Sequence, residues 1–149
     1  MRLKKADKIV KITSWINALE SKKYTQAEGA LCVQDHYTKK YSFCCLGVLC
    51  DLEGYKRKDG EFIFDDVDQG NLGELPVTLS NRFNTSGVWW ITLTNPIKKK
   101  LGKSLTEEEF TNLSNIVNNQ NKFNLISLND TCKFSFAQIA KVLRIVYLK

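Results

Sequence analysis

The sequence predicts an α+β fold: a single compact domain over residues 1–149, helix-rich, with a small, mainly antiparallel sheet. Apolar residues recur at helical spacing near both ends of the chain. Between them lie short β-type segments bounded by glycine and polar turns. A chain of 149 residues can bury about 68–70% of the surface that its unfolded form exposes, so it needs neither a metal nor a disulfide to fold.

The N-terminal third is expected to form a helix and then a hairpin. Residues 5–21 form an amphipathic helix, because its apolar residues fall on one stripe: Ile9, Ile12, Ile16 and Leu19. Residues 24–33 favour an extended segment with a bend at Gly29, and the polar residues 34–40 favour a loop or a hairpin tip. Residues 41–43 complete a strand.

A second, shorter helix is predicted at 44–52, where leucines lie three residues apart and Gly54 follows at the position after the C-cap. Residues 55–59 are expected to form a turn and 61–65 a strand. Three aspartates then crowd the stretch 65–68. They do not match a calcium loop, because valine stands where that loop needs glutamate, so an acidic surface loop is expected.

Helix signals dominate the C-terminal half. Pro76 opens a helix through residue 83, and Asn95 is expected to cap another that ends near residue 102. Thr106 and Glu109 form a capping box for the next helix, and the last helix begins at residue 134 or 135. The tryptophan-containing stretch 85–93 fits either a strand or an aromatic-lined loop.

The chain carries 22 Lys and Arg against 16 Asp and Glu, a formal net charge of +6. This balance favours an anionic partner such as a nucleotide or nucleic acid, although a charge of this size also serves solubility alone. No apolar run approaches the ~18 residues of a membrane span, and no secretory signal opens the chain. No membrane contact and a cytoplasmic location are therefore expected.

Three of the five cysteines lie in the stretch YSFCCLGVLCDL, residues 41–52. Their spacing is unlike a zinc site, and an odd count in a cytoplasmic setting disfavours disulfides. Cys44 or Cys45 at a helix N-terminus is a candidate nucleophile, yet the single histidine, His36, belongs to a separate polar loop. Buried core thiols are the favoured interpretation, with no metal, no cofactor and no catalytic residue assigned.

Several motifs together resemble a family of small bacteriophage and prophage proteins of uncharacterised activity. The first comprises Ala18, Leu19, Ser21, Tyr24, Gln26, Gly29 and Leu31. The second is the block CCLGVLCDL, residues 44–52. The third comprises Leu128, Asn129, Asp130, Ser135, Phe136, Ile139 and Ala140. This resemblance implies a phage protein acting in the cytoplasm of an infected bacterial host.

The leading hypothesis is a non-catalytic, anti-defence accessory protein that sequesters an anionic nucleotide-type ligand. Seven residues are the ligand-binding candidates: Tyr24, Gln26, Trp89, Trp90, Asp51, Asn129 and Asp130. The aromatic rings would stack on a base. Phosphate would meet nearby cations: Lys39, Lys40, Lys56, Arg57 and Lys98 to Lys100. The competing interpretation has the tryptophans packed, the lysines solvated and the polar residues in local caps and pairs.

Two other functions stay open. One is an inhibitor that binds a host defence protein or nucleic acid directly, for which the sequence offers no recognisable nucleic-acid fold motif. The other is a small hydrolase that depends on Cys44 or Cys45, or on the carboxylates of Asp51 and Asp130. Homo-oligomerisation also stays open.

Overall fold

The computed structural model describes residues 2–65 and 73–148. The helices within them are α1 Lys5–Glu20, α2 Cys45–Leu52, α3 Val77–Arg82, α4 Asn95–Ser104, α5 Glu107–Asn115, α6 Leu125–Asp130 and α7 Phe136–Tyr147. The strands are β1 Cys32–Gln34, β2 Tyr41–Phe43, β3 Arg57–Lys58, β4 Glu61–Phe62, β5 Trp90–Thr92 and β6 Lys122–Asn124. These elements make the predicted α+β domain, rich in helix and poor in strand.

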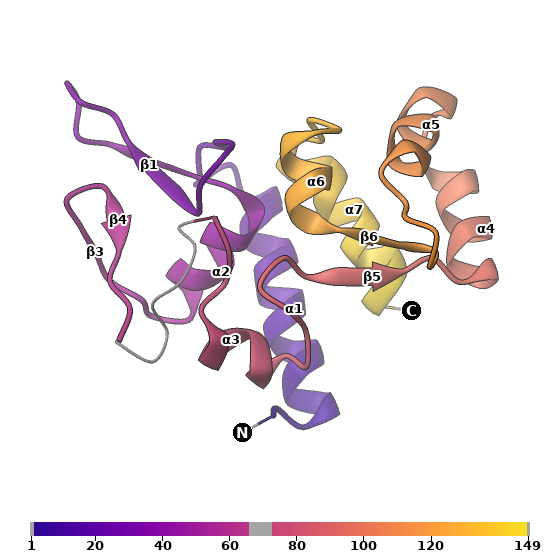
Figure 1. Cartoon of the computed structure of the whole chain (residues 1–149), viewed down its shortest axis with the longest axis horizontal. Coiled ribbons are helices and arrows are strands. Elements are labelled where there is room, and N and C mark those ends of the chain that lie inside the picture. Colours follow the sequence, from indigo (N-terminus) through magenta and orange to yellow (C-terminus); the bar gives the residue numbers. More distant parts are fainter. Residues whose placement is uncertain (1, 66–72, 149) are drawn as a thin grey trace.

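The core lies where α1 packs against α7 and α2 (Figure 1). Helix α1 buries Ile12, Trp15, Ile16 and Leu19, three of which belong to the predicted apolar stripe. Helix α7 buries Ile139, Val142 and Leu143 among others. The burial of apolar area on both helices supplies the main favourable term for folding. The β1–β2 and β3–β4 hairpins lie at one end of the molecule, and α4 and α5 at the other (Figure 1).

The strands of the described residues form three two-stranded antiparallel sheets. In the first, Val33 of β1 faces Ser42 of β2, and the polar loop between them forms the predicted hairpin tip. In the second, Asp59 and Gly60 make the turn with φ angles of 54° and 86°, as a tight hairpin turn requires. Of the residues predicted as a turn, 55–59, Arg57 and Lys58 thus form strand β3 and Asp59 begins the turn. An isolated parallel bridge joins Gln26 to Phe43.

Most helix boundaries agree with the sequence signals. Both capping boxes are present, one at Thr106 with Glu109 and one at Ser135 with Gln138. The predicted cap at Asn95 is wrong: Asn95 is the first residue of α4, and the Thr94 hydroxyl accepts the hydrogen bond from the N–H of Ile97. Thr94 can act as the N-cap because its backbone is extended, which places the side-chain hydroxyl over the first turn of α4.

Strand β6 and helix α6 form from a stretch for which the sequence analysis predicted no element. Strand β6 exists because it pairs with β5, placing Ile91 opposite Phe123. Residues 90–92 of the tryptophan stretch are thus strand, and residues 85–89 before them are turn or irregular backbone. The acidic surface loop predicted after Asp65 lies outside the described residues. None of the described helices has the length and apolar character needed to cross a membrane.

Candidate functional site

Gln26 and Asn129 are joined by a hydrogen bond although 103 residues separate them. The side-chain N–H of Gln26 donates to Asn129 Oδ1 at 2.9 Å and to the carbonyl of Phe134 at 2.8 Å. Its Oε1 accepts from the backbone N–H of Phe136 at 3.0 Å. Every polar atom of the Gln26 side chain is therefore engaged, which joins the extended segment to the start of α7.

Asn129 is fully buried and holds the same segment from the other side. Its Oδ1 also accepts from the N–H of Cys45 at 3.3 Å, and its Nδ2 donates to the carbonyl of Ala27 at 2.9 Å and to Asp130 Oδ1 at 2.7 Å. Asp130 Oδ2 in turn accepts from the N–H of Gly29 at 3.1 Å. Gln26, Asn129 and Asp130, three of the ligand-binding candidates, thus lie together, and their hydrogen bonds are made within the chain.

Tyr24 and Asp51 form a second cluster with Arg57. The Tyr24 hydroxyl donates to Asp51 Oδ2 at 2.5 Å, and the Arg57 guanidinium pairs with Asp51 Oδ1. Burial, followed by this hydrogen bond, raises the pKa of Tyr24 to about 12, so the phenol stays protonated at neutral pH. The Arg57 guanidinium lies over the rings of Tyr41, Phe43 and Phe62, 4.7 to 5.9 Å from their centroids. The cluster therefore connects α2 to both hairpins.

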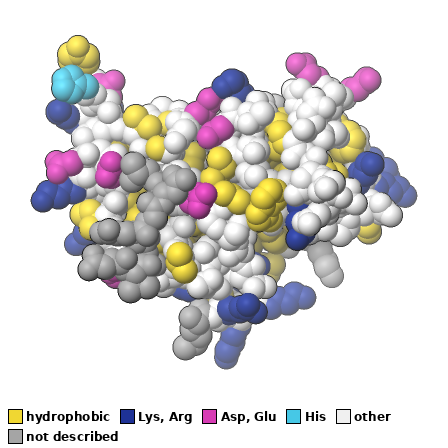
Figure 2. Space-filling model, viewed as in Figure 1, with side chains coloured by type: hydrophobic (Ala, Val, Ile, Leu, Met, Phe, Trp, Pro, Cys, Tyr) yellow, Lys and Arg dark blue, Asp and Glu magenta, His cyan; other side chains and the backbone are white. Residues whose placement is uncertain are grey.

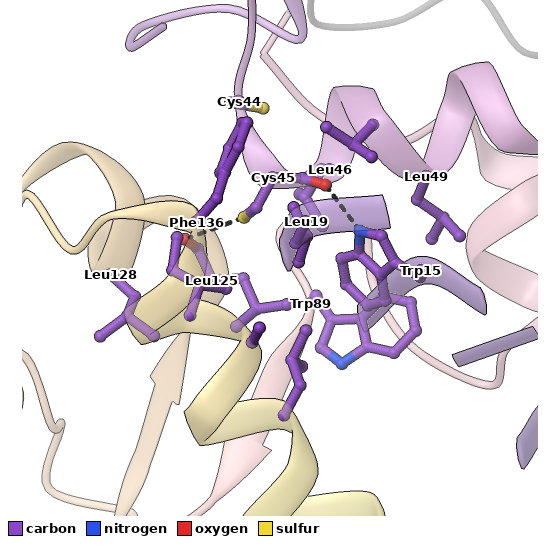
Figure 3. Packing of buried hydrophobic residues seen from close by; sticks show 14 of the residues in the cluster. Trp15, Leu19, Cys44, Cys45, Leu46, Leu49, Trp89, Leu125, Leu128 and Phe136 are labelled. Carbon is purple, nitrogen blue, oxygen red and sulfur yellow. Dashed lines mark hydrogen bonds between the residues drawn. The ribbon is translucent and has the colours of Figure 1, made fainter. Parts of the chain in front are cut away.

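The two tryptophans proposed for base stacking occupy different environments. Trp89 is fully buried, packs its ring 5.0 Å from that of Trp15, and donates from Nε1 to the Tyr147 hydroxyl at 2.7 Å (Figure 3). Its faces are therefore taken by the core. Trp90 is 42% exposed on β5 and keeps ring surface available to solvent.

The cysteines of the CCLGVLC block are core residues (Figure 3). Trp15 Nε1 donates to the Cys45 carbonyl at 2.9 Å, and the Cys45 thiol lies 3.7 Å from the carbonyl of Leu125. Burial raises the pKa of Cys44 to about 11 and the pKa values of Cys45 and Cys50 well above their ordinary value. Thiols in this state are poor nucleophiles, which argues against the cysteine-dependent hydrolase.

The described residues offer no ready metal centre. Among the residues that the structure describes, no three or more His, Cys, Asp and Glu side chains are placed to hold an ion together. His36 is exposed at the β1–β2 hairpin tip with its ring 5.2 Å from that of Tyr37, whereas the thiols of Cys44 and Cys45 are buried.

A groove of about 470 Å³ lies between α4 and the C-terminal part of α7. It is lined by Lys100, Lys103, Ser104, Arg144, Ile145 and Leu148. Figure 2 shows Lys and Arg side chains gathered at the right-hand edge of the molecule, over α4. Three cations thus surround an apolar floor, and the lining contains no carboxylate. Such a lining suits an anion that carries an apolar or planar part.

A second groove of about 350 Å³ lies at the opposite end, between the two hairpins. Residues 30–36 form one wall, and residues 59–62 with Phe64 form the other. Lys39 also lines it, together with the carboxylates of Asp35, Asp59 and Glu61. The lysine clusters considered in the sequence therefore do not share one site, because Lys39 and Lys100 line different grooves.

Sequence reasoning proposed Lys98 to Lys100 as phosphate ligands and missed Lys103 and Arg144. A signal for both was present, because Lys100 and Lys103, like Lys141 and Arg144, are three residues apart on a helix and so share a side of it. The sequence did not show that these two helices pack together. That contact creates the groove.

Comparison with known proteins gives a family but no activity. No curated protein matches the chain, and no solved structure matches it either. One family model, described as a domain of unknown function (DUF8296), matches residues 7–146. The match extends from the first helix into α7, and it includes every residue that lines the two grooves except Leu148. The chain belongs to this family, DUF8296.

Proposed function

We propose that the protein is a non-catalytic binder of an anionic, nucleotide-type ligand, and that it serves a phage by sequestering such a ligand from host defence. The observation that carries the proposal is the groove between α4 and α7, with three cations and no carboxylate in its lining. The overall charge of +6 adds a long-range attraction for anions. The phage setting rests on the sequence motifs alone.

The two sides of the groove supply different chemistry. Lys100 and Lys103 on α4 are exposed, so their ammonium groups can turn toward phosphate oxygens. Arg144 on α7 contributes a guanidinium that pairs with Glu20 through Nε at 3.4 Å and through Nη2 at 2.5 Å. Its Nη2 also donates to Asn17 Oδ1 at 3.4 Å, so the N–H groups of Nη1 are the ones left for a ligand. Ile145 and Leu148 offer apolar contact to a base or sugar. A volume of about 470 Å³ lies within the usual range for small-molecule sites.

Most of the residues first considered for binding take no part in this proposal. The polar side chains of Gln26 and Asn129 are saturated by hydrogen bonds inside the chain, and Trp89 is buried. A ligand would have to break those contacts, each worth about 1 kcal/mol, before gaining any. Trp90 stays available for a stacking contact next to β6.

The test is a titration of the protein with ATP, followed by calorimetry and by amide chemical shifts. Shifts concentrated on α4 and the end of α7 would support the proposal. The double variant Lys100→Gln/Lys103→Gln should weaken binding about tenfold, because two charge contacts are lost. The matched control is Lys56→Gln/Lys58→Gln, which removes the same charge from exposed residues of the other end.

Two results would count against the proposal. The first is the absence of any binding of ATP, AMP or a short oligonucleotide at low salt. The second is an equal loss of affinity in the α4 variant and in the control, because that would indicate attraction to net charge without a site.

A further inference from the structure

The outer edge of β1 carries backbone groups that point away from its partner strand. The N–H of Cys44 donates to the carbonyl of Leu31 at 3.2 Å, and the N–H of Asp35 donates to the carbonyl of Lys40 at 2.8 Å. Antiparallel pairs alternate, so the hydrogen-bonded positions of the strand are 31, 33 and 35. The N–H and C=O groups of Cys32 and Gln34 therefore face outward, which is the pattern that an added strand needs.

The opposite edge of this sheet is already closed. The N–H of Phe43 donates to the carbonyl of Thr25, and the carbonyl of Phe43 accepts from the N–H of Ala27, both at 2.7 Å. In the described part of the chain, β1 pairs with β2 alone. The sheet can therefore grow at β1 and not at β2.

The groove between the hairpins runs along this edge. Every residue from Ala30 to His36 lines it. Successive side chains of a strand point to opposite faces, so an unbroken run of lining residues means that the backbone edge itself forms the wall. The strand face that carries Cys32 is covered instead, because the N–H of Gly60 donates to the Tyr41 hydroxyl at 3.1 Å and the Cys32 thiol lies 3.5 Å from the Gly60 carbonyl.

The groove has the opposite charge to the molecule as a whole. Its lining contains the carboxylates of Asp35, Asp59 and Glu61 against the one ammonium group of Lys39. Backbone N–H groups of Thr38 and Tyr37 lower the pKa of Asp35, which keeps that carboxylate charged at neutral pH. Asp59 and Glu61 are exposed, so their charges also meet the incoming partner.

We propose that the outer edge of β1 binds an extended, basic segment of a partner protein as an added β-strand. Main-chain hydrogen bonds to Cys32 and Gln34 hold the segment. Its Lys or Arg side chains face the carboxylates of Asp59 and Glu61, which form the acidic wall of the groove. Val33 is 44% exposed on the far face of the strand and offers an apolar neighbour to the segment's alternate residues. This function is independent of anion capture between α4 and α7.

The experiment uses a synthetic probe, the amidated and acetylated hexapeptide Lys-Val-Arg-Val-Lys-Val, and amide hydrogen exchange measured by NMR on the full chain. In the free protein we expect the outward N–H groups of Cys32 and Gln34 to exchange fast and that of Val33 to be protected by its pairing with β2. Saturating peptide should slow the exchange of both outward groups by at least about tenfold and leave Val33 nearly unchanged.

Two control peptides separate strand addition from simple attraction. A version N-methylated at every residue keeps the charges and side chains but loses all of its backbone donors, so it should give no protection. A version with Glu in place of Lys and Arg should bind weakly or not at all. Equal protection by either control, or none by the probe at millimolar concentration, overturns the proposal.

Variants test the acidic wall. Asp59→Asn/Glu61→Gln should weaken the probe severalfold at low salt, and asparagine tolerates the positive φ of 54° at position 59. The matched control, Glu107→Gln/Glu108→Gln, removes two exposed carboxylates from α5 and should leave affinity unchanged. Lys100→Gln/Lys103→Gln should also leave it unchanged, so this proposal and the anion proposal can fail separately. Equal weakening by the wall and α5 variants would overturn it.

Discussion

Gly47 on α2 lies against the carbonyl group of Leu31, so closely that a Cβ atom at position 47 would stand 1.8 Å from the Leu31 oxygen. The same oxygen accepts a hydrogen bond from the N–H of Cys44. Helix and chain thus meet backbone to backbone just before β1 begins. The glycine of the CCLGVLCDL block is required by this approach, which fixes α2 against the first hairpin.

We expect Gly47→Ala to destabilise the fold by about 3 kcal/mol or more, because the Leu31 backbone must move to admit the methyl group. Urea unfolding measures the change. Gly102→Ala is the control. Gly102 lies in α4 with open space around it, so alanine there should raise the free energy of unfolding by about 0.5–1 kcal/mol. Equal effects of the two variants would contradict the close approach.

Asn129→Ala should cost about 3 kcal/mol, because it leaves the buried N–H of Cys45 and the carbonyl of Ala27 without a partner. The free energy of unfolding from urea denaturation is again the measurement. Asn119→Ala changes an exposed turn residue and should stay within about 0.5 kcal/mol. A full loss of ligand binding with unchanged stability would instead assign Asn129 to a binding site.

The thiols should differ sharply in their reactivity toward a disulfide reagent at mildly alkaline pH. Cys132 is half-buried, whereas Cys32, Cys44, Cys45 and Cys50 are buried. We expect one fast thiol in the folded protein and slow modification of the other four at the rate of unfolding. Cys132→Ser should remove the fast phase. A fast phase that persists in this variant would revive the cysteine-dependent hydrolase.

Tyr24 should make stability fall between pH 10 and about 12. Its pKa rises from 10.0 to about 12 in the folded state, so within this range the unfolded chain loses the phenol proton that the folded chain keeps. Below pH 10 both states hold the proton and the contribution is complete. Tyr24→Phe should make this decline shallower in urea unfolding and remove one tyrosinate transition near pH 12 from the ultraviolet absorbance titration.

The control for this pH dependence is Tyr37→Phe, which changes a side chain that is 90% exposed at the hairpin tip. It should leave the decline above pH 10 in place. If Tyr37→Phe reduces the decline as much as Tyr24→Phe does, the raised pKa of Tyr24, caused by its burial and by the hydrogen bond to Asp51, is not the source of the decline.

Elements with strong local signals could be predicted. The stripe at Ile12, Ile16 and Leu19, the capping box at Thr106, and Gly54 with its φ of 89° after α2 all act within a few residues. Strand β6 and helix α6 were missed because three- and six-residue elements carry little periodicity. They are stabilised by contacts with β5 and α2.

The sequence by itself determined the helical framework, the basic balance and the apolar character of the cysteine block. Those properties follow from spacing and residue type, which need no partner elsewhere in the chain. The tertiary structure decided which charges act together. It joined Lys100 to Arg144 in one groove, placed Asp35 beside Glu61 in another, and used Gln26 and Asn129 to hold the chain. Contacts between residues so far apart in sequence form only when the burial of apolar surface outweighs the entropy cost of closing the loop between them. Local sequence patterns do not reveal that balance.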